Sequence, residues 1–253
     1  MIQQKGFIRL RGGSMGDTTF VKSADGSFRA QEKKVLPKAR FKTDPAFQRV
    51  RENNSEFLTA AKAGKLLRYS VNDYARTAND SRTISRLLQA MRKVINADKV
   101  SGPGLRNVLD GDVHFLNNFE FNKNSTTQLV FPDQVVGTIN RVTGELTISH
   151  ASIIPTAKIV RPSTGATHFE IVTAGVELDL EQDTFKADNK TTGILPYNNT
   201  PLVINAVHTV TANSTHPLML VFGVQFHELF NGVLRPFTEG TQNALKIVVI
   251  QKP

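Results

Sequence analysis

Positive charge is concentrated in the first 110 residues of this 253-residue chain. Residues 1–110 hold 22 Lys and Arg against 10 Asp and Glu, a net charge of +12, whereas residues 111–253 hold 9 against 12, a net charge of −3. A region this basic attracts polyanions or acidic protein surfaces, and a near-neutral region does not. The sequence therefore indicates two regions with different tasks, and partner binding is expected of the first.

The composition narrows the class of protein. A hydrophobic fraction of 40% over 253 residues is enough for a folded core. The chain has no Cys, which excludes a disulfide framework, a thiolate zinc site and a cysteine nucleophile. We find no apolar run of signal-peptide or membrane-span length. We therefore expect no signal peptide, no membrane span, and a location in the cytoplasm or in an assembled particle.

Residues 1–42 have the composition of an extended arm. Short β-like segments at 7–10, 18–21 and 27–30, with Asp25-Gly26 as a turn signal, predict a small hairpin. A basic run around Pro37 then has too few apolar residues to hold a core of its own. We interpret this run as a linker or a docking tail. Its basic residues are Lys33, Lys34, Lys38, Arg40 and Lys42.

Residues 43–104 are predicted to form a helical hairpin. Asp44 can cap the first turn of a helix and Pro45 suits its first position, while Asp80 can cap a second helix. The expected buried stripe of the first helix is Phe47, Val50, Asn54, Phe57, Ala61 and Gly64. The expected apolar face of the second is Ile84, Leu87, Leu88, Met91, Val94 and Ile95. We expect two antiparallel helices whose apolar faces meet each other or cover a sheet.

Residues 105–253 have a β texture. A hairpin is predicted around Thr143-Gly144, and the alternation at 176–181 predicts a strand with one buried face and one solvated face. Further strands are expected at 202–210, 218–226 and 245–250, of which 218–226 is apolar enough for a central strand. The predicted fold is α+β: an N-terminal extended arm and an α-helical hairpin followed by an antiparallel β-sandwich, jelly-roll-like or Ig-like.

The sequence contains little that predicts an enzyme. The glycine-rich segment 12–19 lacks the lysine of a phosphate-binding loop, and no Gly-x-Ser-x-Gly occurs. All six His lie in the β region without the spacing of metal ligands. A Ser/His/Asp triad stays open, because geometry and not residue order defines it. We expect a non-enzymatic protein without a cofactor or a metal.

Basic residues are the best candidates for partner contact. Arg82, Arg86 and Lys93 share one face of the second predicted helix, and Asp98 is the only acid between Arg82 and Arg106. The chain has no Trp and its three Tyr are scattered, so nucleic acid would be contacted through phosphates without sequence reading. The candidate contact residues are Lys33, Lys34, Lys38, Arg40, Lys42, Arg82, Arg86, Arg92 and Lys93.

The first half of the chain resembles a group of short bacterial proteins that have no assigned activity. The segments that carry the resemblance are Gly26 to Ala30 with Glu32 and Lys33, Asp44-Pro45-Ala46-Phe47, Arg51-Glu52-Asn53, Glu56-Phe57, Lys62-Ala63-Gly64-Lys65, Ser85-Arg86-Leu87, Arg106-Asn107-Val108 and Asp110-Gly111. The resemblance implies a shared architecture, and it supplies no cofactor and no site residues.

Three functions follow as hypotheses. The first is a structural or self-assembly protein, a homo-oligomer that forms a particle, tube or filament of phage-like type through its basic N-terminal half. The second is a cytosolic protein that binds nucleic acid without sequence preference. The third is a ligand- or carbohydrate-binding β-sandwich, or a hydrolase on that scaffold, which requires a concave site with convergent polar groups.

Overall fold

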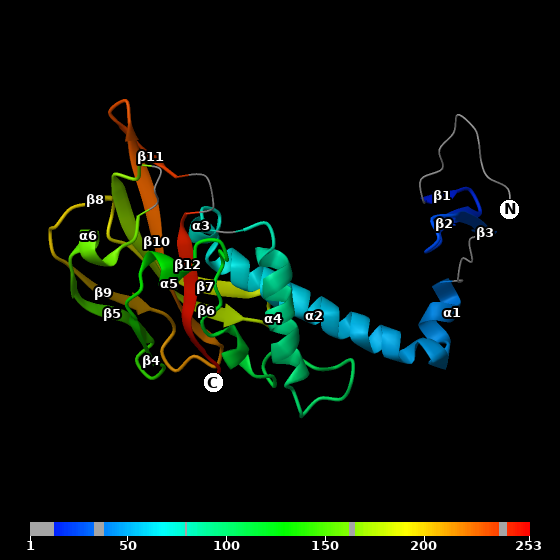
Figure 1. Cartoon of the computed structure of the whole chain (residues 1–253). Helices are drawn as coiled ribbons and strands as arrows, with labels where there is room; N and C mark the ends of the chain where they lie inside the picture. The colour runs from blue at the N-terminus through cyan, green and yellow to red at the C-terminus, as the bar shows by residue number, and fades with distance from the viewer. Residues whose placement is uncertain (1–12, 33–37, 79, 162–164, 238–241) are drawn as a thin grey trace. The chain divides into compact units, whose positions relative to one another are not determined.

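The chain divides into two compact units, the N-terminal unit Met1–Arg51 and the C-terminal unit Glu52–Pro253. The computed structural model describes residues 13–32, 38–78, 80–161, 165–237 and 242–253, whose helices and strands are drawn in Figure 1. The predicted segment 7–10 and the candidate residues Lys33 and Lys34 lie outside the described residues.

The N-terminal unit contains a small antiparallel sheet in the order β1-β2-β3. Its strands are β1 (Gly13–Met15), β2 (Thr18–Lys22) and β3 (Phe28–Glu32). The turn between β2 and β3 contains Gly26 at φ +82°, a left-handed conformation that glycine adopts without strain. The Asp25 carboxylate accepts a hydrogen bond from the Ser27 amide at 2.9 Å and fixes this turn. The hairpin predicted around Asp25-Gly26 is confirmed.

Two short helices follow the sheet. Residues 38–42, expected to be extended, belong to the helix α1 (Lys38–Thr43), and the 3-10 helix η1 (Pro45–Phe47) comes next. An i,i+4 ion pair of 2.9 Å joins Arg40 on α1 to Asp44 and favours a helical backbone. The other carboxylate oxygen of Asp44 accepts from the Ala46 amide at 2.9 Å, which confirms the predicted cap.

The long helix α2 (Gln48–Ser70) crosses the boundary between the units, and α3 (Asn72–Ala75) and α4 (Thr83–Asn96) follow it. The predicted stripe of α2 is wrong at Val50 and Phe57, which are 42% and 47% exposed, and is confirmed at Gly64, which is buried. The helix is covered only toward its C-terminal end, where its buried residues are Ala60, Ala63, Gly64, Leu66, Leu67 and Ser70. A Cβ atom at Gly64 would lie 3.6 Å from Leu87 and Met91 of α4, so the two helices pack at that point.

The second predicted helix is confirmed as α4, with one exception in its apolar face. Leu87, Met91, Val94 and Ile95 are buried, whereas Ile84 in the first turn is 65% exposed. Figure 1 shows α4 lying across α2. The helices thus cover one another and, through the same core, one face of the large sheet described next.

The large antiparallel sheet is built around two long strands, β6 (His168–Asp179) and β10 (Leu218–Phe230). β10 pairs with β6 along one edge and with two shorter strands along the other, which confirms the predicted central strand. The sheet order is β11-β10-β6-β7, with β12 pairing with β10 and β8 with β6. The remaining strands are β7 (Thr184–Thr191), β8 (Leu195–Pro196), β11 (Val233–Pro236) and β12 (Ala244–Gln251).

A smaller antiparallel sheet, in the order β4-β5-β9, covers the other face of the large sheet. Its strands are β4 (Val136–Asn140), β5 (Glu145–Ile153) and β9 (Leu202–Thr209). The turn between β4 and β5 holds Gly144 at φ +74°, which confirms the predicted hairpin. The short helices η2 (Val113–Leu116), α5 (Thr127–Val130) and α6 (Pro155–Lys158) lie in the connections.

Two hydrophobic cores result from this layering. One lies between the helices and the large sheet, and the other lies between the two sheets. Because both of its faces are covered, β6 is buried from Phe169 to Leu178 apart from Glu170. The solvated face expected at 176–181 is therefore wrong at Glu177, which is only 6% exposed. The fold is α+β with antiparallel sheets.

Candidate partner-binding surfaces

The N-terminal unit has no core among its described residues. None of residues 13–32 and 39–51 is buried, and every buried described residue lies at Ala60 or beyond. Residues directly opposite each other in an antiparallel pair project from the same face, so the pair Lys22–Phe28 lies on one face with Phe20 and Met15. Phe28 is 41% exposed and Met15 is 73% exposed. This face, called the arm face below, is apolar at its centre, with Lys22 at one end of the β2–β3 ladder and Glu32 at the other, and it has no cover from the described residues.

The basic residues predicted on the arm differ in their surroundings. Lys38, Arg40 and Lys42 are on α1, where the Arg40 guanidinium pairs with Asp44. Lys42 is exposed and forms no ion pair with a described residue. Hydrogen bonds from Arg40, the larger cause, and from the Ala46 amide hold the pKa of Asp44 below its usual value. Lys42 is thus the clearest free cation on α1.

Three of the four basic residues predicted on the second helix face solvent. Arg82, Arg92 and Lys93 are exposed and have no ion pair with any residue that the structure describes. Arg82 and Lys93 are eleven residues apart, which places them on the same side of α4 about 16 Å from each other. Their charges are available to an anionic surface.

Arg86 instead holds the molecule together. Its guanidinium donates to the carbonyl oxygens of Glu120 at 2.6 Å and Phe121 at 2.9 Å, and it pairs with the Asp80 carboxylate at 2.5 Å. These bonds join the first turn of α4 to the chain that follows η2. Its helical position relative to Arg82 and Lys93 does not reveal this role, which depends on carbonyl groups more than thirty residues away.

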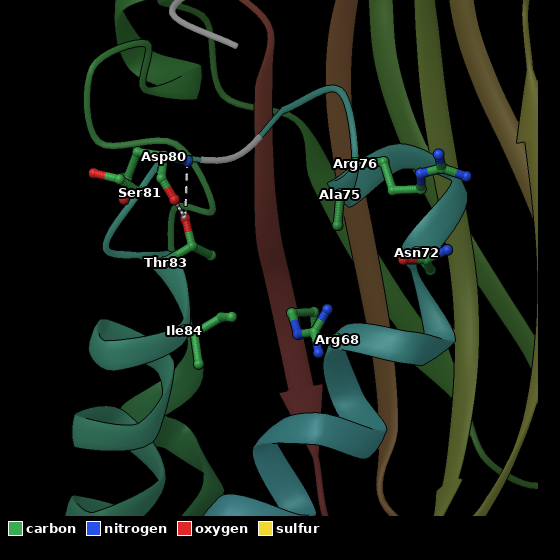
Figure 2. A pocket seen from close by; sticks show the side chains of 8 residues that line it. All are labelled: Arg68, Asn72, Ala75, Arg76, Asp80, Ser81, Thr83 and Ile84. Carbon is green, nitrogen blue, oxygen red and sulfur yellow. Dashed lines mark hydrogen bonds between the residues drawn. The ribbon is translucent and has the colours of Figure 1, made fainter.

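A cleft of about 280 Å³ lies between the end of α2, α3 and the start of α4. Figure 2 shows Arg68 in the gap between these helices and Arg76, the residue after α3, with its side chain extending away from α4. The Tyr69 ring lies under the Arg68 guanidinium, 4.8 Å from its centroid. The lining residues are Arg68, Asn72, Ala75, Arg76, Asp80, Ser81, Thr83 and Ile84.

The only carboxylate in that lining is occupied by internal bonds. Asp80 accepts from the Arg82 amide at 2.7 Å and the Lys123 amide at 2.8 Å, in addition to its pair with Arg86. Burial alone would raise the pKa of Asp80, but these amide bonds and the guanidinium hold it below its usual value. The cleft is therefore cationic, and sequence reasoning missed Arg68 and Arg76, which no periodic pattern sets apart from other surface arginines.

The buried carboxylate of Glu177 is bonded to the segment that follows β9. The Ser214 hydroxyl donates to Glu177 at 2.5 Å, while the ring of the neighbouring His216 lies 3.9 Å from Asp179, so these side chains do not form a Ser/His/Asp triad. Burial raises the pKa of Glu177, but hydrogen bonds from Ser214 and Thr211 outweigh it and lower the pKa.

The described part of the chain contains no group of three or more His, Asp or Glu arranged to hold a metal ion. No helix among the described residues combines the length and the apolar character needed to span a bilayer.

Comparison of the chain with protein-family models, with curated proteins and with solved structures gave no match.

Proposed function

We propose that this chain is a non-enzymatic structural protein whose copies associate through the N-terminal unit. The observation that carries the proposal is that none of residues 13–32 and 39–51 is buried, although the sheet of this unit has an apolar face. A small sheet without a covered hydrophobic face is marginally stable at best in water. Contact with another molecule would supply the missing cover.

A second copy is the partner that we favour. Apolar side chains that stay exposed on a monomer mark interaction surfaces, and closed symmetric oligomers of one chain are the commonest soluble assemblies. The exposed apolar residues continue on α2, where Val50, Phe57 and Leu58 are 42%, 47% and 56% exposed. In this proposal the C-terminal unit is the scaffold, a jelly-roll-like or Ig-like sandwich, and the N-terminal unit is the connector.

Deletion of the connector tests the proposal. Residues 1–47 can be removed without shortening α2, and both hydrophobic cores lie beyond this segment. We expect the full chain to form an oligomer or a particle in size-exclusion chromatography with light scattering and in negative-stain images. The deletion variant should be a folded monomer by circular dichroism. A full-length chain that stays monomeric at all concentrations would refute the proposal.

Sequence-independent nucleic-acid binding is the second candidate, because Arg82, Arg92 and Lys93 project from α4 without ion pairs to the described residues. Binding through phosphates would weaken steeply with salt and would show no preference among sequences. Fluorescence anisotropy with a labelled oligonucleotide distinguishes the two functions. An Arg82→Gln/Arg92→Gln/Lys93→Gln chain should lose affinity for the oligonucleotide, while its self-association should be unchanged.

A further inference from the structure

An acidic cleft in the C-terminal unit has the opposite charge to the N-terminal unit. It has a volume of about 570 Å³ and is lined by α2, the segment after Asn107 and the turn between β6 and β7. Its acidic lining residues are Asp110, Glu181 and Asp183, and Lys62 is its one cation. Its apolar lining residues are Ala63, Val108, Leu109 and Leu180.

The three carboxylates are free for an external cation. None of them forms an ion pair with a described residue, and all three are exposed. The Asp110 carboxylate accepts a hydrogen bond from the side-chain amide of Asn107 at 2.7 Å, and the Asp110 backbone amide donates to the Asn107 side-chain oxygen at 2.9 Å. The cleft thus has a net charge of −2 next to an apolar lining, although the helices around it are basic.

We propose that this cleft receives the N-terminal unit of a second copy. The inference rests on the proposed function, and it names the surface at which association takes place. Residues 1–51 hold 12 Lys and Arg against 4 Asp and Glu, a net charge of +8. At one end of the arm face Lys22 lies beside Phe20 and Phe28, while Glu32 lies at the far end. The Lys22 end has the combination that a cleft with an apolar lining and carboxylates accepts.

The inserting and receiving surfaces differ. If two copies exchange N-terminal units reciprocally, they close a symmetric dimer. If each copy inserts into the next, the contact is heterologous and the product is a ring or a filament. Opposite charges set the orientation and raise the rate of encounter, while burial of the aromatic side chains supplies most of the affinity. Association should therefore weaken with salt but persist in part at high salt.

Full-chain variants test the receiving surface. The cleft variant is Glu181→Lys/Asp183→Asn, in which Asn tolerates the positive φ of 54° at position 183. Its control, Glu145→Lys/Glu228→Gln, makes the same change in net charge on the C-terminal unit outside the cleft. The arm variant is Lys22→Glu/Phe28→Glu. Self-association is measured by light scattering across protein concentrations, at low and high salt.

We expect both the cleft variant and the arm variant to associate at least ~10-fold more weakly than the unmodified chain, and the control to match it. A mixture of the two defective variants should form a complex, because the intact arm face of one meets the intact cleft of the other. Loss of association in the arm variant alone, with the cleft variant unaffected, would overturn this inference and leave the proposed function standing. Unchanged association in the arm variant would overturn both.

Discussion

Gly175 of β6 lies against His208 of β9, so close that a Cβ atom at Gly175 would come within 2.4 Å of the His208 Cβ atom. This contact joins the large sheet to the small one, and His208 is fully buried in it. No side chain larger than hydrogen fits at position 175 without moving one sheet away from the other.

Gly175→Ala should therefore destabilise the protein by roughly 2–3 kcal/mol, the usual cost of overpacking a rigid contact. Urea denaturation measures the free energy of unfolding. Gly102→Ala is the matched control, because a Cβ atom at Gly102 would have no neighbour within 4 Å and the residue has no positive φ. Equal stability of the two variants would show that the sheets do not meet at Gly175.

His208 should make stability depend on pH. Both of its ring nitrogens lack a hydrogen-bond partner among the described residues, and Asp188 is 3.9 Å from Nδ1. Burial lowers the pKa of His208, outweighing Asp188, which raises it, and the Lys190 charge adds to the lowering. The unfolded chain then takes up the proton first, so stability falls as the pH drops below about 6.5.

In His208→Leu, the part of the acid destabilisation just below pH about 6.5 should disappear, whereas His114→Asn, a change at an exposed histidine, should keep it. Urea midpoints across this pH range give the comparison. Identical pH profiles in the unmodified chain and in His208→Leu would contradict the account of this residue.

Asp98 should stabilise the loop after α4. Its carboxylate accepts from the amides of Val100 at 2.8 Å, Ser101 at 2.9 Å and Asn107 at 3.1 Å. Burial raises the pKa of Asp98, but these bonds outweigh it and lower the pKa to about 2. The stabilisation from Asp98 is complete when the pH is above the ordinary pKa of an aspartate side chain. It is lost as the pH falls toward the lowered pKa of the folded state.

Asp98→Asn should lower the free energy of unfolding at neutral pH by on the order of 1–2 kcal/mol. It should also flatten the acid limb of the stability profile below pH about 4. Asp17→Asn, at an exposed position in the N-terminal unit, is the control. A neutral-pH stability equal to that of the unmodified chain would show that the three amides find other acceptors.

Arg86 and Arg92 should respond differently to the same substitution. Arg86→Met leaves the Asp80 carboxylate and the carbonyl oxygens of Glu120 and Phe121 without their guanidinium donor, which should cost roughly 1–3 kcal/mol. Arg92→Met at an exposed position should change stability by less than about 0.5 kcal/mol. Thermal unfolding of the Arg86→Met and Arg92→Met variants compares their melting temperatures. Equal melting temperatures would contradict a structural role for Arg86.

Local signals predicted the elements whose causes are local. Asp25-Gly26, Asp44 and Gly144 act through their own turns, and the apolar run from Leu218 to Phe226 belongs to the central strand β10. The buried stripe of α2 could not be predicted, because it depends on where α4 and the large sheet end along the helix. Glu177 likewise has the alternation of a solvated strand, but it is buried and bonded to Thr211 and Ser214 in the segment that follows β9.

The candidate surfaces were only partly visible in the sequence. The charge excess predicted partner contact through the first half of the chain, and Arg82, Arg92 and Lys93 of that half are exposed. Charge alone does not distinguish these three residues from Arg86, because the guanidinium of Arg86 donates hydrogen bonds to carbonyl groups that are distant in the sequence. The acidic cleft joins Asp110 to Glu181 and Asp183 across some seventy residues, and no sequence pattern links them.

The central claim is that contact between copies covers the N-terminal sheet, and amide hydrogen exchange tests it most directly. The backbone amides of β2 and β3 report whether that sheet persists without a partner. The account predicts that their protection rises with protein concentration and is lost in the Lys22→Glu/Phe28→Glu chain, while amides of β10 stay protected throughout. Protection of β2 and β3 that is the same at every concentration, and in both chains, would contradict it.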